Sequence, residues 1–239
     1  MPIGWQKQPK STETSMVSNN SAFSKEEELP NMGQVEQFVP EQPIRTLEEL
    51  VIPITVRTRI EAALNRIQFH DILYNQWNLR KIDPHRTGTA INLFGPPGTG
   101  KTFCAEAIAK HLMKKIIQVN YAEIESKYVG ETPKNITAAF QKASEADAVL
   151  FFDEADSILG KRLTNVTQSA DHGVNVSRAV MLTQLDKFDG VVIFATNLAQ
   201  NYDGAFVRRI LAHIEFEIPD EECRKALWEY LLTPEGSLR

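Results

Sequence analysis

Two short segments of this 239-residue chain carry the residue types that phosphate and metal chemistry needs. The first, Gly95–Thr102, reads GPPGTGKT and matches the pattern G-x-x-x-x-G-K-[ST] at every position. Glycines let successive backbone N–H groups point at one anion, and a following helix adds the partial positive charge of its N-terminus. We therefore expect Lys101 to reach the β- and γ-phosphates of ATP and Thr102 to place its hydroxyl on Mg²⁺. The candidate nucleotide-binding residues are Gly95, Pro96, Pro97, Gly98, Thr99, Gly100, Lys101, Thr102, Phe103 and Asp153.

The second segment, Phe151–Asp156, reads FFDEAD and sets acidic residues directly behind an apolar run. If that run is a buried strand, its carboxylates lie at the carboxyl edge of a parallel sheet, where ligands of open α/β folds bind. Asp153 is then the candidate to hold hydrated Mg²⁺ together with Thr102, and Glu154 the candidate to polarise the attacking water. The same letters also fit an acidic helix N-terminus, which the helix dipole favours. The phosphate loop about fifty residues earlier favours the catalytic interpretation.

Short apolar runs alternate with helical patterns along the chain, and together they must position these residues. Apolar spacing predicts an amphipathic helix over 55–77, and Thr132 as a cap before Pro133 predicts the start of another. Near-continuous apolar strands that alternate with helices are typical of a parallel sheet covered on both faces. The sequence therefore predicts an α/β fold, the three-layer αβα arrangement of P-loop NTPases, with a five-stranded parallel sheet and a true phosphate loop rather than a chance Gly/Pro turn. The expected strands are 90–94, 116–119, 149–152, 191–195 and 214–218, and further helices follow 102, cover 175–188 and begin after the cap Asp220.

Composition limits what kind of protein this is. The chain has 42% hydrophobic and 24% charged residues, the ordinary globular range, and its net charge of −5 provides no basic field to recruit nucleic acid or anionic lipid. Cys104 and Cys223 stand outside any CxxC or Cys/His cluster, which disfavours a zinc site and fits a reducing, cytoplasmic compartment. No segment has the apolar length of a signal peptide core or of a membrane span.

The first part of the chain differs from the rest. Residues 1–43 are rich in polar residues and proline without a sustained period, so we expect a flexible tail. The alternative is a tether for a partner or substrate, which Trp5, Phe23 and Phe38 could serve. We expect one nucleotide-binding domain over 44–232 and the start of a linker over 233–239.

Five marks together resemble the AAA+ ATPases, within the clade that includes spastin, katanin and the proteasomal ATPases. The resemblance covers about residues 46–232, and it implies a hexameric ring that hydrolyses Mg-ATP to remodel or thread protein substrates. Members of this family normally continue past the fifth strand into a small helical lid, and we expect that lid to be missing from these 239 residues. The marks are GPPGTGKT at 95–102, KYVGE at 127–131, FFDEAD at 151–156, FATN at 194–197 and the double arginine at 208–209.

The resemblance assigns roles to three residues late in the chain. Asn197, at the end of the fourth strand, takes the sensor-1 position and would orient the water that Glu154 activates; the alternative is a polar turn residue at a strand end. Arg208 and Arg209 would reach the γ-phosphate bound by a neighbouring subunit, and which of them carries the larger share stays open. Their alternative role is a surface salt bridge. Gly204, just ahead of them, adds flexibility that family patterns usually lack.

The resemblance also identifies loops that would contact substrate. KYVGE takes the place of pore loop 1, where Tyr128 and Val129 would grip an extended polypeptide in a central channel. The alternative is that Tyr128 packs on its own domain. A second, weaker assignment places another pore loop over Gly160–Gly173, in which His172 alone fits a solvated loop residue.

Two other functions compete with the protein-remodelling motor. A nucleic-acid-linked loader would share the ATP core, but the acidic balance and the lack of a basic stripe with interleaved aromatic residues disfavour it. A scaffold that uses ATP only to assemble is disfavoured by the intact acid pair and Asn197.

Overall fold

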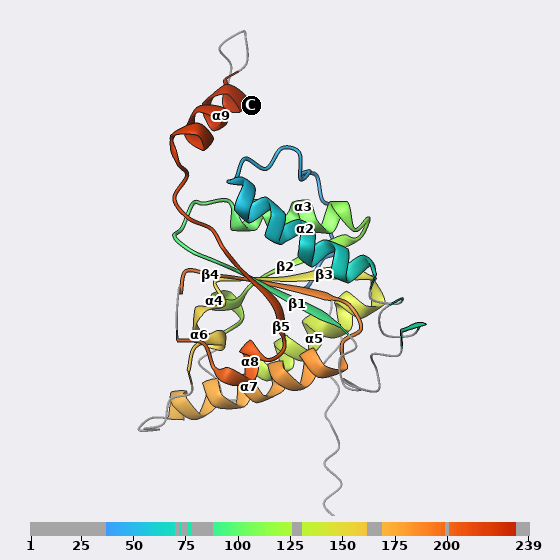
Figure 1. Cartoon of the computed structure of the whole chain (residues 1–239). Helices are drawn as coiled ribbons and strands as arrows, with labels where there is room; N and C mark the ends of the chain where they lie inside the picture. The colour runs from blue at the N-terminus through green and yellow to red at the C-terminus, as the bar shows by residue number, and fades with distance from the viewer. Residues whose placement is uncertain are drawn as a thin grey trace, which may run out of the picture.

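The computed structural model describes residues 37–69, 72, 76–77, 88–125, 131–161, 169–198 and 201–232, the side chains of 169–172 excepted. These residues form three layers, with a central sheet between two groups of helices (Figure 1). The predictions for Tyr128, Val129, residues 1–36 and residues 233–239 lie outside the described part of the chain.

The sheet has five strands in the order β2-β3-β4-β1-β5, and all its neighbouring pairs are parallel. Every residue of the central strand β4 is buried, as is β3 up to its last residue, which explains their continuous apolar runs. The predicted α/β class and five-stranded parallel sheet are confirmed. The strands are β1 (Thr89–Phe94), β2 (Lys115–Asn120), β3 (Ala148–Asp153), β4 (Val191–Thr196) and β5 (Ile210–Glu215).

Helices cover both faces of the sheet. The helices α2 (Ile54–Gln68) and α3 (Lys101–His111) lie on one face, and α5 (Glu131–Glu145) and α7 (Ser169–Lys187) lie on the other (Figure 1). Short helices connect strands to these layers, and α9 follows β5 at the top of Figure 1. They are α4 (Tyr121–Ile124), α6 (Asp156–Leu159), α8 (Gly204–Val207) and α9 (Glu221–Leu231).

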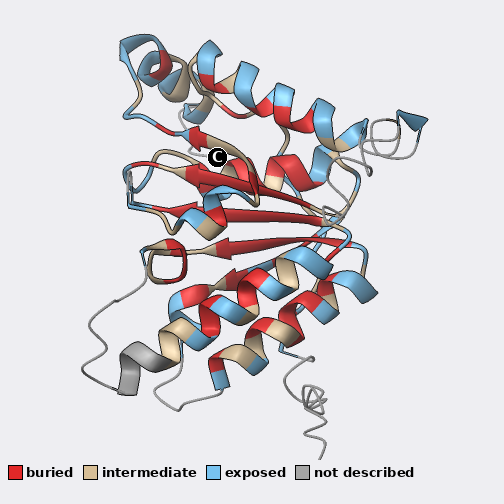
Figure 2. Cartoon of the chain, turned by 60° about the horizontal axis from the view of Figure 1, so that its bottom comes forward, coloured by how far each residue is buried: buried red, intermediate tan, exposed pale blue. Residues whose placement is uncertain are grey.

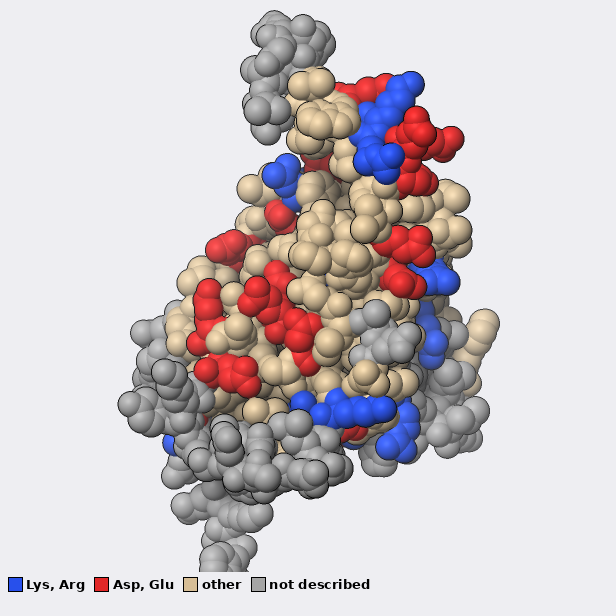
Figure 3. All heavy atoms as spheres, turned by 90° about the vertical axis from the view of Figure 1, so that its left-hand side faces the viewer, with Lys and Arg blue, Asp and Glu red and all other residues tan. Residues whose placement is uncertain are grey.

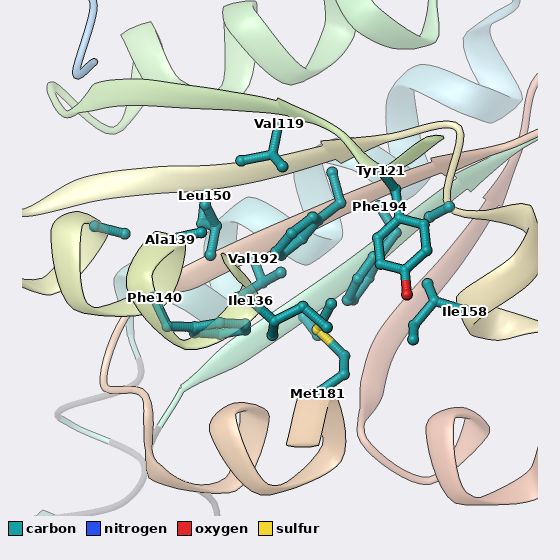
Figure 4. Packing of buried hydrophobic residues seen from close by; sticks show 14 of the residues in the cluster. Val119, Tyr121, Ile136, Ala139, Phe140, Leu150, Ile158, Met181, Val192 and Phe194 are labelled. Atoms are coloured by element: carbon teal, nitrogen blue, oxygen red, sulfur yellow. The ribbon is translucent and has the colours of Figure 1, made fainter. Parts of the chain in front are cut away.

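Neighbouring residues of a strand supply two separate cores. Phe151 of β3 packs towards α2 and α3, whereas the next residue, Phe152, packs towards α5 and α7, so the buried residues line both faces (Figure 2). Phe152 stacks on Phe194 with ring centroids 5.6 Å apart and meets Phe140 at 5.8 Å. Phe140 and Phe194 lie in the same buried cluster, which Figure 4 shows. Because close-packed interiors resist local displacement, these contacts fix the carboxyl ends of β3 and β4 relative to each other.

Two element boundaries differ from the sequence prediction, namely the end of α2 and the start of β5. The helix predicted over 55–77 ends at Gln68, because its buried stripe stops at Leu64 and Phe69 is 51% exposed. The fifth strand, predicted over 214–218, runs over Ile210–Glu215, because pairing with β1 brings Ala90 opposite Ile210. Ile218 is 72% exposed, so its place in the alternating Ile-Glu-Phe-Glu-Ile pattern reflects no buried strand.

Two helices on the other face begin earlier than predicted. Helix α5 begins at Glu131 rather than at Pro133, and α7 begins at Ser169 rather than at residue 175. The first turns of α7 contain Gly173 and mostly polar residues, so they lack the apolar spacing from which the helix was predicted. Part of the segment assigned to a second pore loop is therefore helical.

The first described residues form a strap, residues 37–52, that crosses the edge of the sheet. Phe38 is only 6% exposed and packs in the core, so it is not free to act as a tether, and Trp5 and Phe23 lie outside the described residues. Glu41 exchanges backbone hydrogen bonds of 2.8 and 2.9 Å with Ile116 on the edge strand β2. Ordered packing thus begins six residues before the expected domain boundary at 44.

Candidate functional site

The phosphate loop lies between β1 and α3, as its motif requires. Gly95 has a φ of 138°, and a Cβ there would lie 2.0 Å from the carbonyl oxygen of Phe216. Gly100, with a φ of 97°, is the N-cap of α3. Only glycine adopts both backbone conformations without strain, so the pattern of glycines follows from the shape of the loop.

Lys101 joins the phosphate loop to the end of β4. Its side chain is buried, and Nζ donates to the carbonyl oxygens of Gly95 and Pro96, each at 2.8 Å, and to Oδ1 of Asn197 at 3.1 Å. Burial lowers the pKa of Lys101, while Asp153 and the nearby Asp156 oppose that shift. The ammonium group therefore stands where the phosphate loop and the residue after β4 meet.

Thr102 and Asp153 form a pair of oxygen ligands on neighbouring elements. The Thr102 hydroxyl donates to Oδ2 of Asp153 at 3.0 Å, and Oδ1 of the same carboxylate accepts from the backbone N–H of Glu154 at 2.9 Å. Hydroxyl and carboxylate oxygens are the hard ligands that Mg²⁺ prefers, and Mg²⁺ takes its other ligands from water and phosphate oxygens. The residues present fit a magnesium ion shared with a bound triphosphate.

Glu154 has a left-handed backbone conformation, which nothing in the sequence led us to expect. Its φ of 53° lies in the left-handed region, which costs a non-glycine residue about 1–3 kcal/mol and persists only where the surroundings hold it. The next residue, Ala155, donates its N–H to the Ala195 carbonyl of β4 at 2.9 Å, which fixes the turn. The exposed Glu154 side chain thus leaves the sheet at a defined point beside Asp153.

Asp156 is a site residue to which the sequence assigned no role of its own. Its Oδ1 accepts from the Thr196 hydroxyl and from the backbone N–H groups of Asn197 at 2.8 Å and Leu198 at 3.1 Å. It therefore ties the start of α6 to the end of β4 and sets the position of Asn197. Its place in FFDEAD was the available signal.

A cavity of about 430 Å³ adjoins the phosphate loop. Three distant segments form it: the strap, the phosphate loop with Phe103, and α9. The Arg45 guanidinium lies 5.2 Å from the Phe103 ring centroid, and the Tyr230 hydroxyl donates to Glu49 at 3.0 Å. No motif in the sequence indicated the strap or α9 residues. The lining residues include Arg45, Leu50, Val51, Gly98, Phe103, Leu227 and Tyr230.

The carboxyl edge of the sheet, at the left of Figure 1, faces the viewer in Figure 3. Acidic side chains gather on this face, and at the same edge Asp153 ends β3 while Glu154 and Asp156 follow it. An anionic ligand that binds here needs cationic partners. Lys101 and a divalent ion at Thr102 and Asp153 would supply them.

The two candidate arginines lie at the opposite edge of the sheet. They immediately precede β5, whose first residue is paired with Ala90 near the start of β1, so they are roughly 15 Å from the phosphate loop at the end of β1. Arg209 binds Asp186 of α7 through two hydrogen bonds of 2.7 and 2.6 Å, which raises the pKa of Arg209. Arg208 is exposed and donates from Nε to Gly204 at 3.2 Å. The structure brings Lys101, Thr102, Asp153 and Asn197 together, and it separates both arginines from them.

Gly204 is less free than the sequence suggested. It is the first residue of α8, and the Asp203 side chain caps that helix by accepting from the N–H of Ala205 at 2.8 Å. The cap fixes the turn that leads to Arg208.

Comparisons with known proteins support one family. Residues 91–218, more than half of the chain, match the family model described as "ATPase family associated with various cellular activities (AAA)". The chain is 39% identical over 154 residues to the 26S proteasome regulatory subunit 6B homolog of Encephalitozoon cuniculi, a match that covers 62% of this chain and 39% of that protein. It is 37% identical over 169 residues to the subunit 6B homolog of Dictyostelium discoideum, covering 68% and 40%, and 39% identical over 150 residues to the subunit 7 homolog of Saccharomyces cerevisiae, covering 60% and 31%. The chain thus spans about a third to two fifths of the length of these relatives.

Among the residues that the structure describes, none of the helices has the length and apolar character that a membrane crossing requires.

Proposed function

Because the chain belongs to the ATPase family associated with various cellular activities (AAA), we propose that it binds and hydrolyses Mg-ATP as a subunit of a ring that acts on protein substrates. One observation carries this proposal: at one edge of the sheet, two hydrogen bonds join residues at the ends of three different strands, from Lys101 to Asn197 and from Thr102 to Asp153.

The geometry divides the work of hydrolysis among these residues. With ATP on the phosphate loop, Lys101 exchanges carbonyl partners for β- and γ-phosphate oxygens, while the adenine side occupies the cavity beside Phe103. Glu154 accepts a proton from a water molecule while the water oxygen attacks the γ-phosphorus. The bond between that phosphorus and the β–γ bridging oxygen breaks, and ADP and phosphate form. The side-chain amide of Asn197 orients that water, and Asp156 holds the residue in place by accepting from its backbone N–H. Thr102 and Asp153 would hold Mg²⁺, which would supply positive charge beside the phosphate oxygens.

The position of the two arginines supports the proposed ring. Since Arg208 is roughly 15 Å from its own phosphate loop, it acts on nucleotide bound by the next subunit rather than its own. A hexamer in the cytoplasm is the assembly we propose, and the relatives whose names describe them as proteasome regulatory subunits agree with a protein substrate. Tyr128 and Val129 are the residues we propose to contact that substrate.

Two substitutions test the nucleotide site. Glu154→Gln removes the proton acceptor but leaves the phosphate cradle, so steady-state ATP turnover falls by about 10²–10⁴-fold while ATP affinity stays unchanged. Lys101→Met removes the ammonium group and abolishes retention of a fluorescent ATP analogue with magnesium present. Glu145→Gln makes the same chemical change as Glu154→Gln on an exposed helix end and leaves both readouts unchanged. Turnover by the Glu154 variant equal to that of the parent would leave only the assembly scaffold.

A third substitution tests the protein substrate. Tyr128→Ala should abolish ATP-dependent unfolding of a tagged fluorescent protein while basal ATP turnover persists, because the aromatic ring would contact the polypeptide rather than the nucleotide. Tyr128→Phe keeps the ring and should keep the unfolding activity. Unfolding that continues in the alanine variant would contradict threading by this loop.

A further inference from the structure

Arg178 of α7 is a buried arginine to which the mechanism above gives no role. It is 4% exposed, and its guanidinium donates to the carbonyl oxygens of Ser157 at 2.6 Å, Ile158 at 3.2 Å and Lys161 at 2.9 Å. A guanidinium group is costly to bury unless its donors are satisfied, and carbonyls at a helix C-terminus lack acceptor partners within the helix. The rigid fork of arginine serves both needs here in a way that a lysine ammonium group cannot.

The carbonyls that Arg178 holds belong to the end of α6 and the residues after it, and α6 begins at the catalytic edge. This four-residue helix starts at Asp156, directly after Glu154 and Ala155. Asp156, at the start of α6, accepts from the backbone N–H of Asn197, whereas Arg178 binds carbonyl groups near the end of α6. One short rigid element therefore connects the guanidinium group to both residues that handle the attacking water.

The residues around Arg178 anchor α6 to other elements as well. Tyr121, at the start of α4, is buried, and its hydroxyl points towards Ile158 of α6 (Figure 4). At the end of α6, Leu159 accepts from the N–H of Asp203, the cap of the helix that leads to Arg208. The end of α6 is thus a junction of four helices, with the Arg178 guanidinium bound to its carbonyl groups.

We propose that Arg178 is a positioning residue for ATP hydrolysis, which acts through α6 on the placement of Glu154 and Asn197; this inference rests on the proposed ATPase function. Arg178 contacts neither nucleotide nor metal in this role. Misplacement of a catalytic group by about 1 Å costs on the order of 10²-fold in rate, so a loosened α6 reduces turnover without weakening ATP binding.

The experiment compares Arg178→Lys and Arg178→Met in the intact protein, with Leu182→Ala as the control. Leu182→Ala removes buried packing from the same helix and removes no side-chain hydrogen bond. For both arginine variants we expect kcat for ATP to fall on the order of 10–10²-fold, with methionine the more severe, while KM for ATP and the Kd of ADP change by less than about 2-fold. The control should lower the unfolding temperature at least as much as Arg178→Lys and leave kcat within about 2-fold of the parent.

Each other outcome overturns the proposal. A lysine variant with parental kcat, or one whose loss lies in KM, shows that Arg178 only stabilises the fold, as does a control that loses kcat in proportion to stability. If the methionine variant does not fold, the lysine variant decides alone. A parent protein that binds ATP but does not hydrolyse it removes the proposed function itself, and the parent measurement distinguishes that failure from failure of the Arg178 role.

Discussion

At the carboxyl edge of the sheet, two hydrogen bonds join side chains from the ends of three strands. At the amino edge, by contrast, neither arginine contacts these side chains. Lys101 reaches Asn197 and Thr102 reaches Asp153 within one chain. At the other edge, Arg209 binds Asp186 of its own domain and Arg208 is exposed.

The difference shows how far one subunit can prepare its own chemistry. The residues that we propose to bind phosphate and metal are already in contact within one chain, so we expect a single chain to bind nucleotide without a partner. The exposed arginine gains a role in hydrolysis only if a second copy presents its phosphate loop to it. The predictions that follow test this separation.

The largest expected effect comes from Arg208→Ala, which should lower ATP turnover of the assembled protein by about 10³–10⁵-fold and leave ATP affinity intact. Mixing this variant with Glu154→Gln should restore part of the turnover, because some interfaces then combine a normal acid with a normal arginine from different subunits. Steady-state turnover of each variant and of the mixture measures this. Co-assembled variants that regain no turnover would place Arg208 and Glu154 in the same functional site of one chain.

For Arg209, which is paired with Asp186, we expect an effect on stability rather than on turnover. Arg209→Ala removes a partly exposed ion pair with Asp186, which typically contributes under about 1 kcal/mol to stability. Asp186→Asn should match its small loss in unfolding temperature. If Arg209→Ala instead loses turnover as severely as Arg208→Ala, both arginines act on the neighbouring nucleotide.

An intermediate effect is expected at the metal ligands. Asp153→Asn should raise the Mg²⁺ concentration for half-maximal turnover on the order of 10–100-fold, because it removes the anionic oxygen beside Thr102. Thr102→Ser keeps the hydroxyl and should change this concentration far less. A magnesium titration of turnover at saturating ATP separates the two variants, and identical titrations would exclude Asp153 from the metal site.

How much of this could be read from the sequence depends on whether the signal is local. Strands β1, β3 and β4 lie within one residue of their predicted bounds, because the buried centre of a parallel sheet demands unbroken apolar runs, and the edge strand β2 was found through its short apolar run. β5 was displaced by four residues at its start, because an edge strand alternates and its position is set by pairing with β1. The phosphate loop and the acid pair are likewise local patterns.

The parts of the site that the sequence missed come from contacts between distant segments. Arg178 stands twenty-one residues from Ser157, whose carbonyl it binds, and nothing in its local pattern distinguishes it from a surface arginine of a helix. The cavity beside the phosphate loop joins the strap to α9, and one of its contacts spans 181 residues. Such contacts become visible only after the chain is folded.

The smallest expected effect lies at that cavity. Tyr230→Phe removes the hydrogen bond to Glu49, which closes the strap against α9 on the base side of the site. A partly exposed hydrogen bond contributes about 0.5–1 kcal/mol, so ATP affinity should fall by roughly 2–5-fold, with kcat unchanged. Glu49→Gln keeps an acceptor oxygen and should lose less than Tyr230→Phe, as titration with a fluorescent ATP analogue would measure. An unchanged ATP affinity in both variants would mean that the residues at the carboxyl edge alone set nucleotide affinity. The contact between the strap and α9 would then contribute nothing to ATP binding.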